Sequence, residues 1–285
     1  MSVLPSPALP LGKVSAVPDS YSPDLLYPVP RAVGRSQFLS GSSVPFQGSD
    51  RWDCFEVSWL SDRGIPQTAY ANIQYSASSP NIVESKSLKL YLTGFHNTRC
   101  VSSQALAEQI TTDLAAALDA ADVSCDIIPF AQMPEPTPYQ NLGQCLDTLE
   151  LTGEGLDFDA NQPVSLLQCN EAAAPATAQV YSHNLRSLCP VTGQPDWATV
   201  VVRYRGRLIE PASLFRYLMA YRNHQGFHEA CCEQMFVDIL SACAPDELAV
   251  GCYFARRGGI AITPVRYLSD RSFCEDMFTL RLDRQ

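Results

Sequence analysis

The chain has 285 residues, of which 46% are hydrophobic and 18% are charged, and its net charge is −10. This length and composition are typical of one large or two ordinary folded domains with an ample core. The acidic balance argues against tight nucleic-acid binding, which needs a basic face. No apolar stretch is long enough to span a bilayer, so we expect no membrane association.

Residues 1–31 are rich in proline and serine and lack the basic-then-apolar layout of a secretory signal. We expect residues 1–35 to form an amino-terminal strap. The eleven cysteines are an odd number in a chain without such a signal, which argues against a disulfide framework. We therefore expect a reduced, cytoplasmic protein in which most cysteines are small buried apolar residues.

The next part of the chain predicts a strand, two helices and a strand. Apolar alternation indicates a strand at residues 70–75, and apolar positions at helical spacing follow Glu84. A second amphipathic helix is predicted at residues 103–120 and a strand at residues 124–129. Two less regular stretches follow: the proline-rich residues 133–139, which predict a connector, and the acidic residues 146–178, which predict a linker or an added hairpin.

The carboxy-terminal part predicts the same order of elements. It offers a strand, a helix led by Glu210, a second helix and three further strands, expected at residues 199–204, 210–221, 227–242, 248–254, 260–265 and 278–282. Strands and helices in this order predict an α+β fold with helices on one face of an antiparallel sheet.

The two parts also match residue by residue. Residues 83–92 can be laid over residues 209–218, and Gly64 meets Gly193 upstream after a small change of frame. Matching blocks in the same order indicate a tandem duplication, and the period is too long for a solenoid. We expect one copy in residues 36–138, the linker or hairpin in residues 139–178, and the other copy in residues 179–285.

Positions at which the copies differ are candidates for chemistry. In the frame of the repeat, Leu60 stands where the second copy has Cys189, and Gln67 stands where it has Asp196. A thiolate is a strong nucleophile, and a carboxyl group beside it can move a proton. The two side chains would meet if the intervening turn folds back. The alternative is a buried cysteine and an aspartate that caps the turn.

The first copy has its own distinctive residues, Lys86 and Lys89, where the second has Ala212 and Phe215. Cations at a helix start suit a phosphate-bearing ligand. The alternative is an ordinary solvated helix face. No Gly-x-Gly-x-x-Gly sequence follows a strand, so a Rossmann cofactor domain is not expected.

His224 and His228 lie one helical turn apart, with Cys231 and Cys232 nearby. This spacing resembles a zinc site, but no Cys-x-x-Cys or His-Glu-x-x-His sequence accompanies it, so we expect no metal. The pair His228-Glu229 is better suited to hydrogen bonding with the edge of a planar heterocycle.

Several motifs together resemble the 7-cyano-7-deazaguanine reductases, in particular their long, two-module subgroup. The hexapeptide Glu84-Ser85-Lys86-Ser87-Leu88-Lys89 is similar to the family's signature. The resemblance continues in family order through Leu9-Pro10-Leu11-Gly12-Lys13, Leu25-Leu26-Tyr27-Pro28-Val29-Pro30-Arg31, Ser187-Leu188-Cys189-Pro190, Gln194-Pro195-Asp196-Trp197, Phe227-His228-Glu229 and Arg256-Arg257-Gly258-Gly259.

The resemblance implies a fold and a reaction. The fold is a tandem pair of tunnelling-fold domains, each an antiparallel sheet backed by two helices. The reaction is an NADPH-dependent, four-electron reduction of the nitrile of 7-cyano-7-deazaguanine to an aminomethyl group, a step toward queuosine in tRNA. It uses two NADPH molecules and no metal. A homodimer is the family expectation.

The resemblance also implies residue roles. Cys189 would add to the nitrile carbon as a covalent thioimide, and Asp196 would supply the proton. The substrate would be held by Glu229 and His228 and by a wall from the first module, Ile82, Val83 and Glu84. NADPH would be held by Ser85, Lys86, Arg257 and Gly258.

Two other readings remain open at this point. A pterin-forming cyclohydrolase of the same fold would need a zinc set, which only His224, His228 and the nearby cysteines could supply. A non-catalytic module that binds deazapurines would tolerate Cys189→Ser and would oxidise no NADPH.

Overall fold

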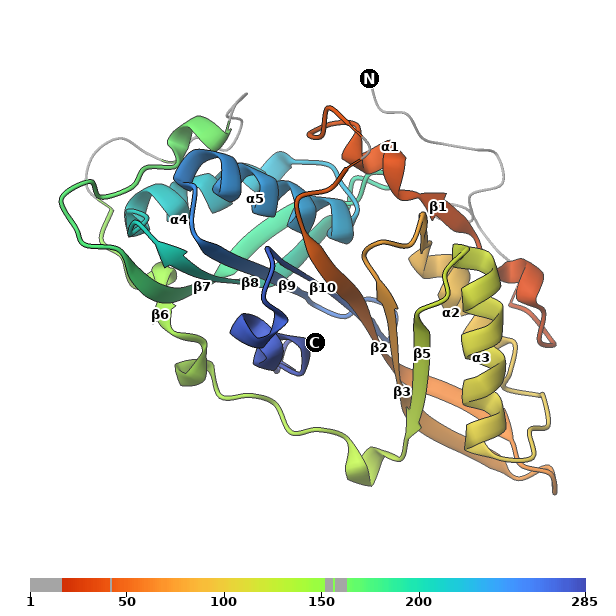
Figure 1. Ribbon diagram of the computed structural model, residues 1–285. Helices are drawn as coiled ribbons and strands as arrows, with labels where there is room; N and C mark the ends of the chain where they lie inside the picture. Colours follow the sequence, from red (N-terminus) through yellow and green to blue (C-terminus); the bar gives the residue numbers. More distant parts are fainter. Residues whose placement is uncertain (1–16, 42, 152–155, 157–162) are drawn as a thin grey trace.

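The computed structural model describes residues 17–41, 43–151, 156 and 163–285. Within these residues, eight strands form one sheet in the order β5-β3-β2-β10-β9-β8-β7-β6 (Figure 1). Neighbouring strands run antiparallel except for the short parallel pair β6–β7. The expected block at residues 9–13 lies outside the described residues, as do residues 152–155 and 157–162 of the acidic segment predicted at residues 146–178.

The first half of the sheet is preceded by a strap, whose strand β1 pairs with β4 beside the large sheet. The strap comprises η1 (Pro23–Leu25), β1 (Pro28–Pro30) and α1 (Arg31–Arg35). The elements that follow are β2 (Gln47–Leu60), β3 (Pro66–Ser76), β4 (Asn81–Val83), α2 (Ser85–Thr93), α3 (Ser103–Leu118) and β5 (Val123–Ile128).

A long connector leads from β5 along the sheet to its opposite edge (Figure 1). It contains the short elements η2 (Phe130–Gln132), η3 (Tyr139–Leu142), β6 (Gln144–Cys145), η4 (Leu146–Thr148) and η5 (Pro163–Leu166). Leu142, Leu146 and Leu167 are buried in the hydrophobic clusters, so this part of the chain is packed onto the domain.

In the second half of the sheet, two long strands, two helices and a strand again follow one another, and β10 is added. Its elements are β7 (Ala176–Leu188), β8 (Pro195–Gly206), α4 (Pro211–Met219), η6 (Ala220–Asn223), α5 (His228–Cys243), β9 (Glu247–Phe254), β10 (Ile260–Tyr267) and η7 (Arg271–Phe278). Strand β10 pairs with β9 on one side and with β2 on the other, which joins the two halves into one sheet.

Equivalent positions of the two halves make equivalent contacts. The Tyr91 hydroxyl donates to Asp113 at 2.6 Å, and the Tyr217 hydroxyl donates to Asp238 at 2.8 Å. The first strand of each half carries a register shift, between Cys54 and Val57 in β2 and between residues 182 and 185 in β7. The predicted α+β class with an antiparallel sheet is confirmed, and the repeat is visible in the contacts.

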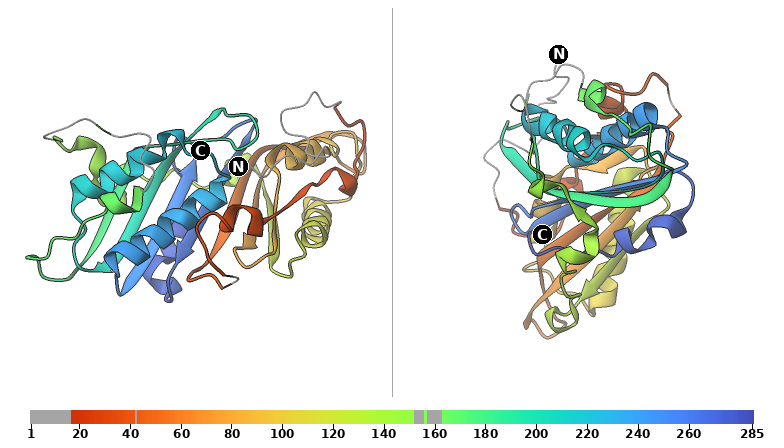
Figure 2. Two further views of the ribbon diagram at one scale, coloured as in Figure 1. Left: turned by 90° about the horizontal axis from the view of Figure 1, so that it is seen from above. Right: turned by 90° about the vertical axis from the view of Figure 1, so that its left-hand side faces the viewer.

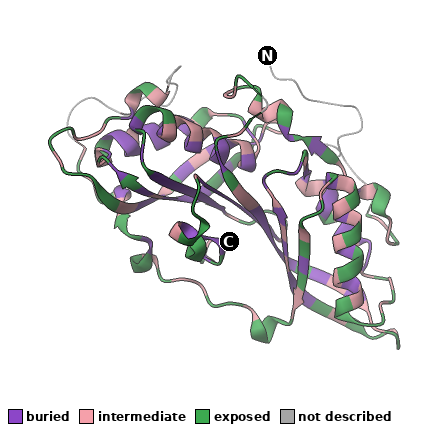
Figure 3. Cartoon of the chain, in the orientation of Figure 1, coloured by how far each residue is buried: buried purple, intermediate pink, exposed green. Residues whose placement is uncertain are grey.

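The helices of both halves cover one face of the sheet (Figure 2). The opposite face of the second half packs against the carboxy-terminal residues, in a cluster that includes Val201, Tyr253, Val265, Met277 and Leu282. Burial is therefore continuous through the middle of the sheet (Figure 3). Among the described residues, no helix combines the length and the apolar composition that crossing a bilayer requires.

The strand expected at residues 278–282 is wrong. This segment follows the 3₁₀ helix η7 and lies over the sheet face instead of joining an edge. Because the Arg51 guanidinium donates to the carbonyls of Phe278 at 2.9 Å and Leu280 at 2.6 Å, a side chain satisfies groups that a strand neighbour would otherwise bind. Its alternating apolar residues fill the cluster beneath β9.

Candidate active site

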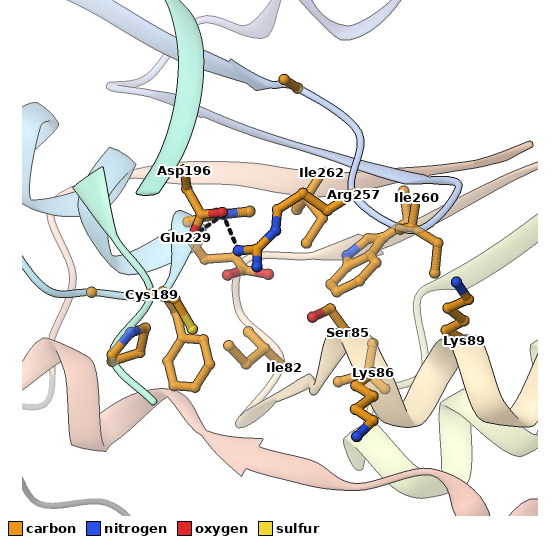
Figure 4. A pocket seen from close by; sticks show the side chains of 17 residues that line it. Ile82, Ser85, Lys86, Lys89, Cys189, Asp196, Glu229, Arg257, Ile260 and Ile262 are labelled. Atoms are coloured by element: carbon orange, nitrogen blue, oxygen red, sulfur yellow. Dashed lines mark hydrogen bonds and ion pairs between the residues drawn. The ribbon is translucent and has the colours of Figure 1, made fainter. Parts of the chain in front are cut away.

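A cavity of about 170 Å³ lies where the two halves of the sheet meet. Most of the site residues predicted from the sequence line it, although they come from both halves of the chain (Figure 4). These are Ile82, Val83, Ser85, Lys86, Cys189, Asp196, His228, Glu229 and Arg257. Glu84 and Gly258 do not belong to its described lining.

Cys189 follows the last residue of β7 and opens the turn into β8. Its backbone N–H donates to the Gln194 carbonyl at 2.8 Å, and the Gly193 N–H donates back to the Cys189 carbonyl at 3.0 Å. Gly193 has a φ of +67°, which a glycine adopts without strain. The turn folds back, so Ser187 lies opposite Asp196 in the sheet and both ends of the motif reach the cavity.

The expectation that Leu60 occupies the position of Cys189 is wrong. Leu60 and Leu188 are the equivalent strand ends, since each forms a parallel bridge, to Arg99 and to Gln225 respectively. The residue that corresponds to Cys189 is therefore Ser61, whose N–H donates to the Ile65 carbonyl. The turn of the second half is one residue longer, and this moves the frame of the repeat.

Asp196 is buried, and its carboxylate has an arginine and a histidine as neighbours. Arg257 Nη1 donates to Oδ1 at 2.5 Å, and His228 Nε2 lies 3.3 Å from Oδ2. Burial disfavours the charged carboxylate, but hydrogen bonds and charge from His228 and Arg257 outweigh it, so the pKa of Asp196 lies below its ordinary value. We therefore describe Asp196 as a carboxylate at neutral pH, able to accept a proton.

His228 and Glu229 begin α5, and both face the cavity. The His228 ring stacks on Phe254 with ring centres 3.8 Å apart, which fixes its orientation. Glu229 is 3% exposed, and its Oε1 has no hydrogen-bond partner among the described residues. Burial and the nearby Asp50 raise the pKa of Glu229 to about 7, against the effect of His228 and Arg31. Such a carboxylate is prepared for a ligand that brings its own donors.

Replacing Glu229 with glutamine is expected to stabilise the ligand-free protein at pH 8. The folded protein holds a proton between about pH 4.5 and pH 7 that the unfolded chain releases, so the wild type loses stability as pH rises through this window. The loss is on the order of 3 kcal/mol and persists above pH 7. Urea unfolding of E229Q and wild type at pH 4 and pH 8 measures it. The stability gap should open at pH 8 and close at pH 4; a gap independent of pH would contradict the raised pKa.

The first helix of the site is held by Glu84. Its carboxylate accepts the N–H groups of Lys86 at 2.7 Å and Ser87 at 2.8 Å, so Glu84 serves as the amino-terminal cap of α2. Because this carboxylate accepts from two amides at the helix start, those two amides are not available to an anionic ligand, whereas the side chains of Lys86 and Lys89 line the cavity. Gly258 lies close to the Lys89 side chain, since a Cβ at residue 258 would lie 2.9 Å from Lys89 Nζ.

Other lining residues were not among the predicted site residues. The apolar ones are Trp52 of β2, Phe227 ahead of α5, Ile260 and Ile262 of β10, together with Pro190, Gly226 and Ala255. Lys89 also lines the cavity. Phe227 and Lys89 lie inside motifs quoted above, so the sequence carried a signal for them. For Trp52 and the β10 residues it carried none, since their position depends on the pairing of β2 with β10.

The alternative zinc site would require several donor side chains close together. Within the described ranges, no group of three or more His, Cys, Asp and Glu side chains is arranged to hold a metal ion. The described cysteines, Cys189 among them, are free thiols.

Comparison with known proteins gives consistent matches along the chain. A family model described as "Nitrile reductase, 7-cyano-7-deazaguanine-reductase N-term" matches residues 17–127, and one described as "QueF-like protein" matches residues 195–272. Curated proteins named NADPH-dependent 7-cyano-7-deazaguanine reductase are similar over nearly the whole chain. The protein from Bordetella pertussis is 43% identical over 258 residues, which cover 90% of this chain and 92% of that protein.

The protein of the same name from Verminephrobacter eiseniae is 41% identical over 278 residues, covering 97% of this chain and 99% of that protein. Among solved structures, the crystal structure of the archaeosine synthase QueF-Like in the apo form matches with a TM-score of 0.32 and 19% identity. That match covers 34% of this chain and 98% of the other.

Proposed function

Since the chain belongs to the family of NADPH-dependent 7-cyano-7-deazaguanine reductases, we propose that it reduces the nitrile of 7-cyano-7-deazaguanine to an aminomethyl group. The family predicted from the motifs is thereby confirmed, and with it the class of NADPH-dependent oxidoreductases. The observation that carries the proposal is the single cavity that gathers Cys189, Asp196 and Glu229 beside cationic side chains. The product would serve queuosine biosynthesis.

In the proposed chemistry, Cys189 is the nucleophile. Its sulfur bonds to the nitrile carbon, and the thiol proton passes to the Asp196 carboxylate, which delivers it to the nitrile nitrogen. The product is a covalent thioimide, and the addition neither consumes nor releases a proton overall. The ionised state of Asp196 supports this order, because a carboxylate must take up a proton before it can supply one. A nitrile accepts hydride poorly, and a protonated thioimide is a better electrophile.

Glu229 and His228 would hold the deazaguanine, with Ile82 and Val83 on the other side of the cavity. A guanine-like edge offers a ring N–H and an amino group, and a carboxylate accepts from both. The unpartnered Glu229 oxygen among the described residues supports this role. Glu84, which we predicted in this wall, is assigned instead to positioning, because its carboxylate caps α2.

The residues around α2 fit a phosphate-bearing cofactor. Lys86 and Lys89 line the cavity, and Arg257 faces them with 42% of its side chain exposed. When bound, NADPH supplies hydride, two molecules per nitrile. Ser85, Lys86, Arg257 and Gly258 would hold it, with Arg257 as the partner of the 2′-phosphate. No metal is part of the proposal.

We propose two tunnelling-fold modules, residues 36–138 and 179–285, with the strap at residues 1–35 and a linker or hairpin at residues 139–178. The equivalent contacts of the two halves support this division. We also propose a cytoplasmic homodimer that binds no nucleic acid. Gel filtration that gives only a monomer would remove the dimer.

The proposed function is tested by mixing the purified protein with 7-cyano-7-deazaguanine and following NADPH absorbance. We expect two NADPH oxidised per nitrile, and intact-mass analysis without NADPH should show an adduct of the full substrate mass. A folded protein that binds the substrate without oxidation or adduct would instead be the non-catalytic deazapurine module.

Lys86→Ala is expected to weaken NADPH binding about tenfold, because it removes one of the ammonium groups that face the cofactor phosphates. The apparent KM for NADPH should rise while the KM for the nitrile changes little. Arg63→Ala is the control: it removes an exposed cation in the β2–β3 turn, away from the cavity lining. An unchanged KM for NADPH in K86A would exclude Lys86 from the cofactor site.

A further inference from the structure

Glu229 separates two cavities. On one side it lines the site described above, and on the other it lines a small cavity of about 20 Å³ beneath the strap. Ile82 and Phe227 also line both. The lining of the small cavity also includes Arg31, the first residue of α1, and Glu233 of α5. The charge of Arg31 can therefore act on the Glu229 carboxylate from the side of the small cavity.

Arg31 is held in place by a buried polar cluster. Its Nη2 donates to Asp50 Oδ2 at 2.5 Å, and its Nε donates to the Ser79 carbonyl at 3.0 Å. Arg31 is 5% exposed and Asp50 is fully buried. The second terminal nitrogen, Nη1, lies 3.5 Å from Glu233 Oε1 but makes no hydrogen bond within the described part of the chain.

Unsatisfied polar atoms gather at this one place. Arg31 Nη1, Asp50 Oδ1, Tyr75 Oη and Glu229 Oε1 are buried without a hydrogen-bond partner in the described ranges. Asp50 Oδ1 does lie 2.8 Å from Arg266 Nη2 as an ion pair. Buried polar groups are normally paired, so such a concentration requires an explanation. In an interior of low dielectric, buried charges of one cluster act strongly on one another.

We propose that Arg31 is a positioning residue that favours the ionised form of the Glu229 carboxylate, the form that accepts hydrogen bonds from the substrate, in opposition to Asp50. The strap thereby takes part in substrate recognition without touching the substrate. This inference rests on the proposed role of Glu229 in substrate binding. It extends that role by naming Arg31 and Asp50 as the two charged residues whose opposing effects set the ionisation of the Glu229 carboxylate.

Other titratable groups face Glu229 and must stay unchanged in any test. Tyr75 faces it from β3, His228 adjoins it on α5, and Asp196 lies behind His228 on β8. Glu233 lies one turn along α5 and is already paired with Arg35 and Arg266. The cavity side holds Lys86, Lys89 and Arg257.

The experiment measures the dissociation constant of 7-cyano-7-deazaguanine from pH 6 to pH 9 by calorimetry. In the wild type, binding should weaken below a midpoint, as Glu229 takes up a proton. In Arg31→Met the midpoint should rise by about one pH unit, which is about a tenfold loss of affinity at pH values below both midpoints and little loss at pH 9. In Asp50→Asn it should fall, and the double variant should lie between the two.

Arg35→Met is the matched control. It removes a cation from the same helix and from the same partner, Glu233, but Arg35 does not contact Asp50. Its midpoint should stay at the wild-type value. Arg31→Lys keeps the positive charge, so the midpoint should stay at the wild-type value even if this variant is less stable. If R31M does not fold, the midpoints of R31K and D50N are measured in its place.

The outcomes separate the two proposals. The role of Arg31 would be overturned if the wild type, R31M and D50N had the same midpoint. It would also be overturned if R31M and R35M shifted the midpoint equally. Wild-type protein that binds no substrate at any pH would instead overturn the proposed function.

Discussion

Cys189→Ala is expected to abolish turnover, with a rate loss of about 10³-fold or more, while the protein stays folded. The loss is large because the proposed covalent route depends on this one sulfur. Folding should survive because the Cys189 side chain lines a cavity rather than filling the core. NADPH oxidation measures the rate, and thermal unfolding checks the fold.

Intact mass gives the decisive readout for this variant. The wild type with substrate alone should gain the whole substrate mass, because addition to a nitrile expels no group, and C189A should gain nothing. Cys100→Ala is the control, since Cys100 is a partly exposed thiol that is not part of the cavity lining. It should keep both turnover and adduct. Turnover retained in C189A would refute the covalent mechanism.

Much of the site could be predicted because its residues lie in short local motifs. Cys189 and Asp196 flank one tight turn, and His228 and Glu229 start one helix, so each motif carries its own geometry. Glu84 shows the limit of such reasoning. A glutamate before a helix is equally suited to cap the helix and to line a site, and here the cap accounts for its carboxylate.

Strand β2 could not be predicted from the sequence because it contains charged residues. Asp50, Arg51 and Asp53 are buried in the middle of it, so the hydropathy pattern does not alternate as in a half-buried strand. These charges are satisfied by distant groups, such as Arg31 for Asp50 and the carbonyls of Phe278 and Leu280 for Arg51. Trp52, which lines the cavity from this strand, could not be placed without it.

The differences between the copies indicated two residues that line the cavity, but the alignment misplaced one residue. Turns differ by one residue between the halves, and a gap within a turn can be drawn at several positions in sequence. The equivalent bridges of Leu60 and Leu188, and the hydrogen bonds of Ser61 and Cys189 to the far ends of their turns, fix the correspondence. A serine stands at the position of Cys189 and Gln67 at that of Asp196, so the first half does not carry the proposed thiol and carboxylate pair.

Asp196→Asn is expected to slow turnover by about 10²- to 10⁴-fold, the range typical of removing a general acid or base. The amide can still accept a hydrogen bond from Arg257 through its oxygen, but it cannot take the proton of Cys189. Formation of the substrate adduct, followed by intact mass against time, should slow by a similar factor, because the proposed proton transfer belongs to that step.

Asp276→Asn provides the matched control for the loss of a carboxylate paired with an arginine. Asp276 lies 2.7 Å from Arg203 on the surface and is 56% exposed, remote from the cavity lining. This variant should turn over at the wild-type rate. If D196N formed the adduct as fast as the wild type and failed only in NADPH oxidation, the proton of thioimide formation would have another carrier. Asp196 would then act later, through its contact with Arg257 beside the cofactor residues.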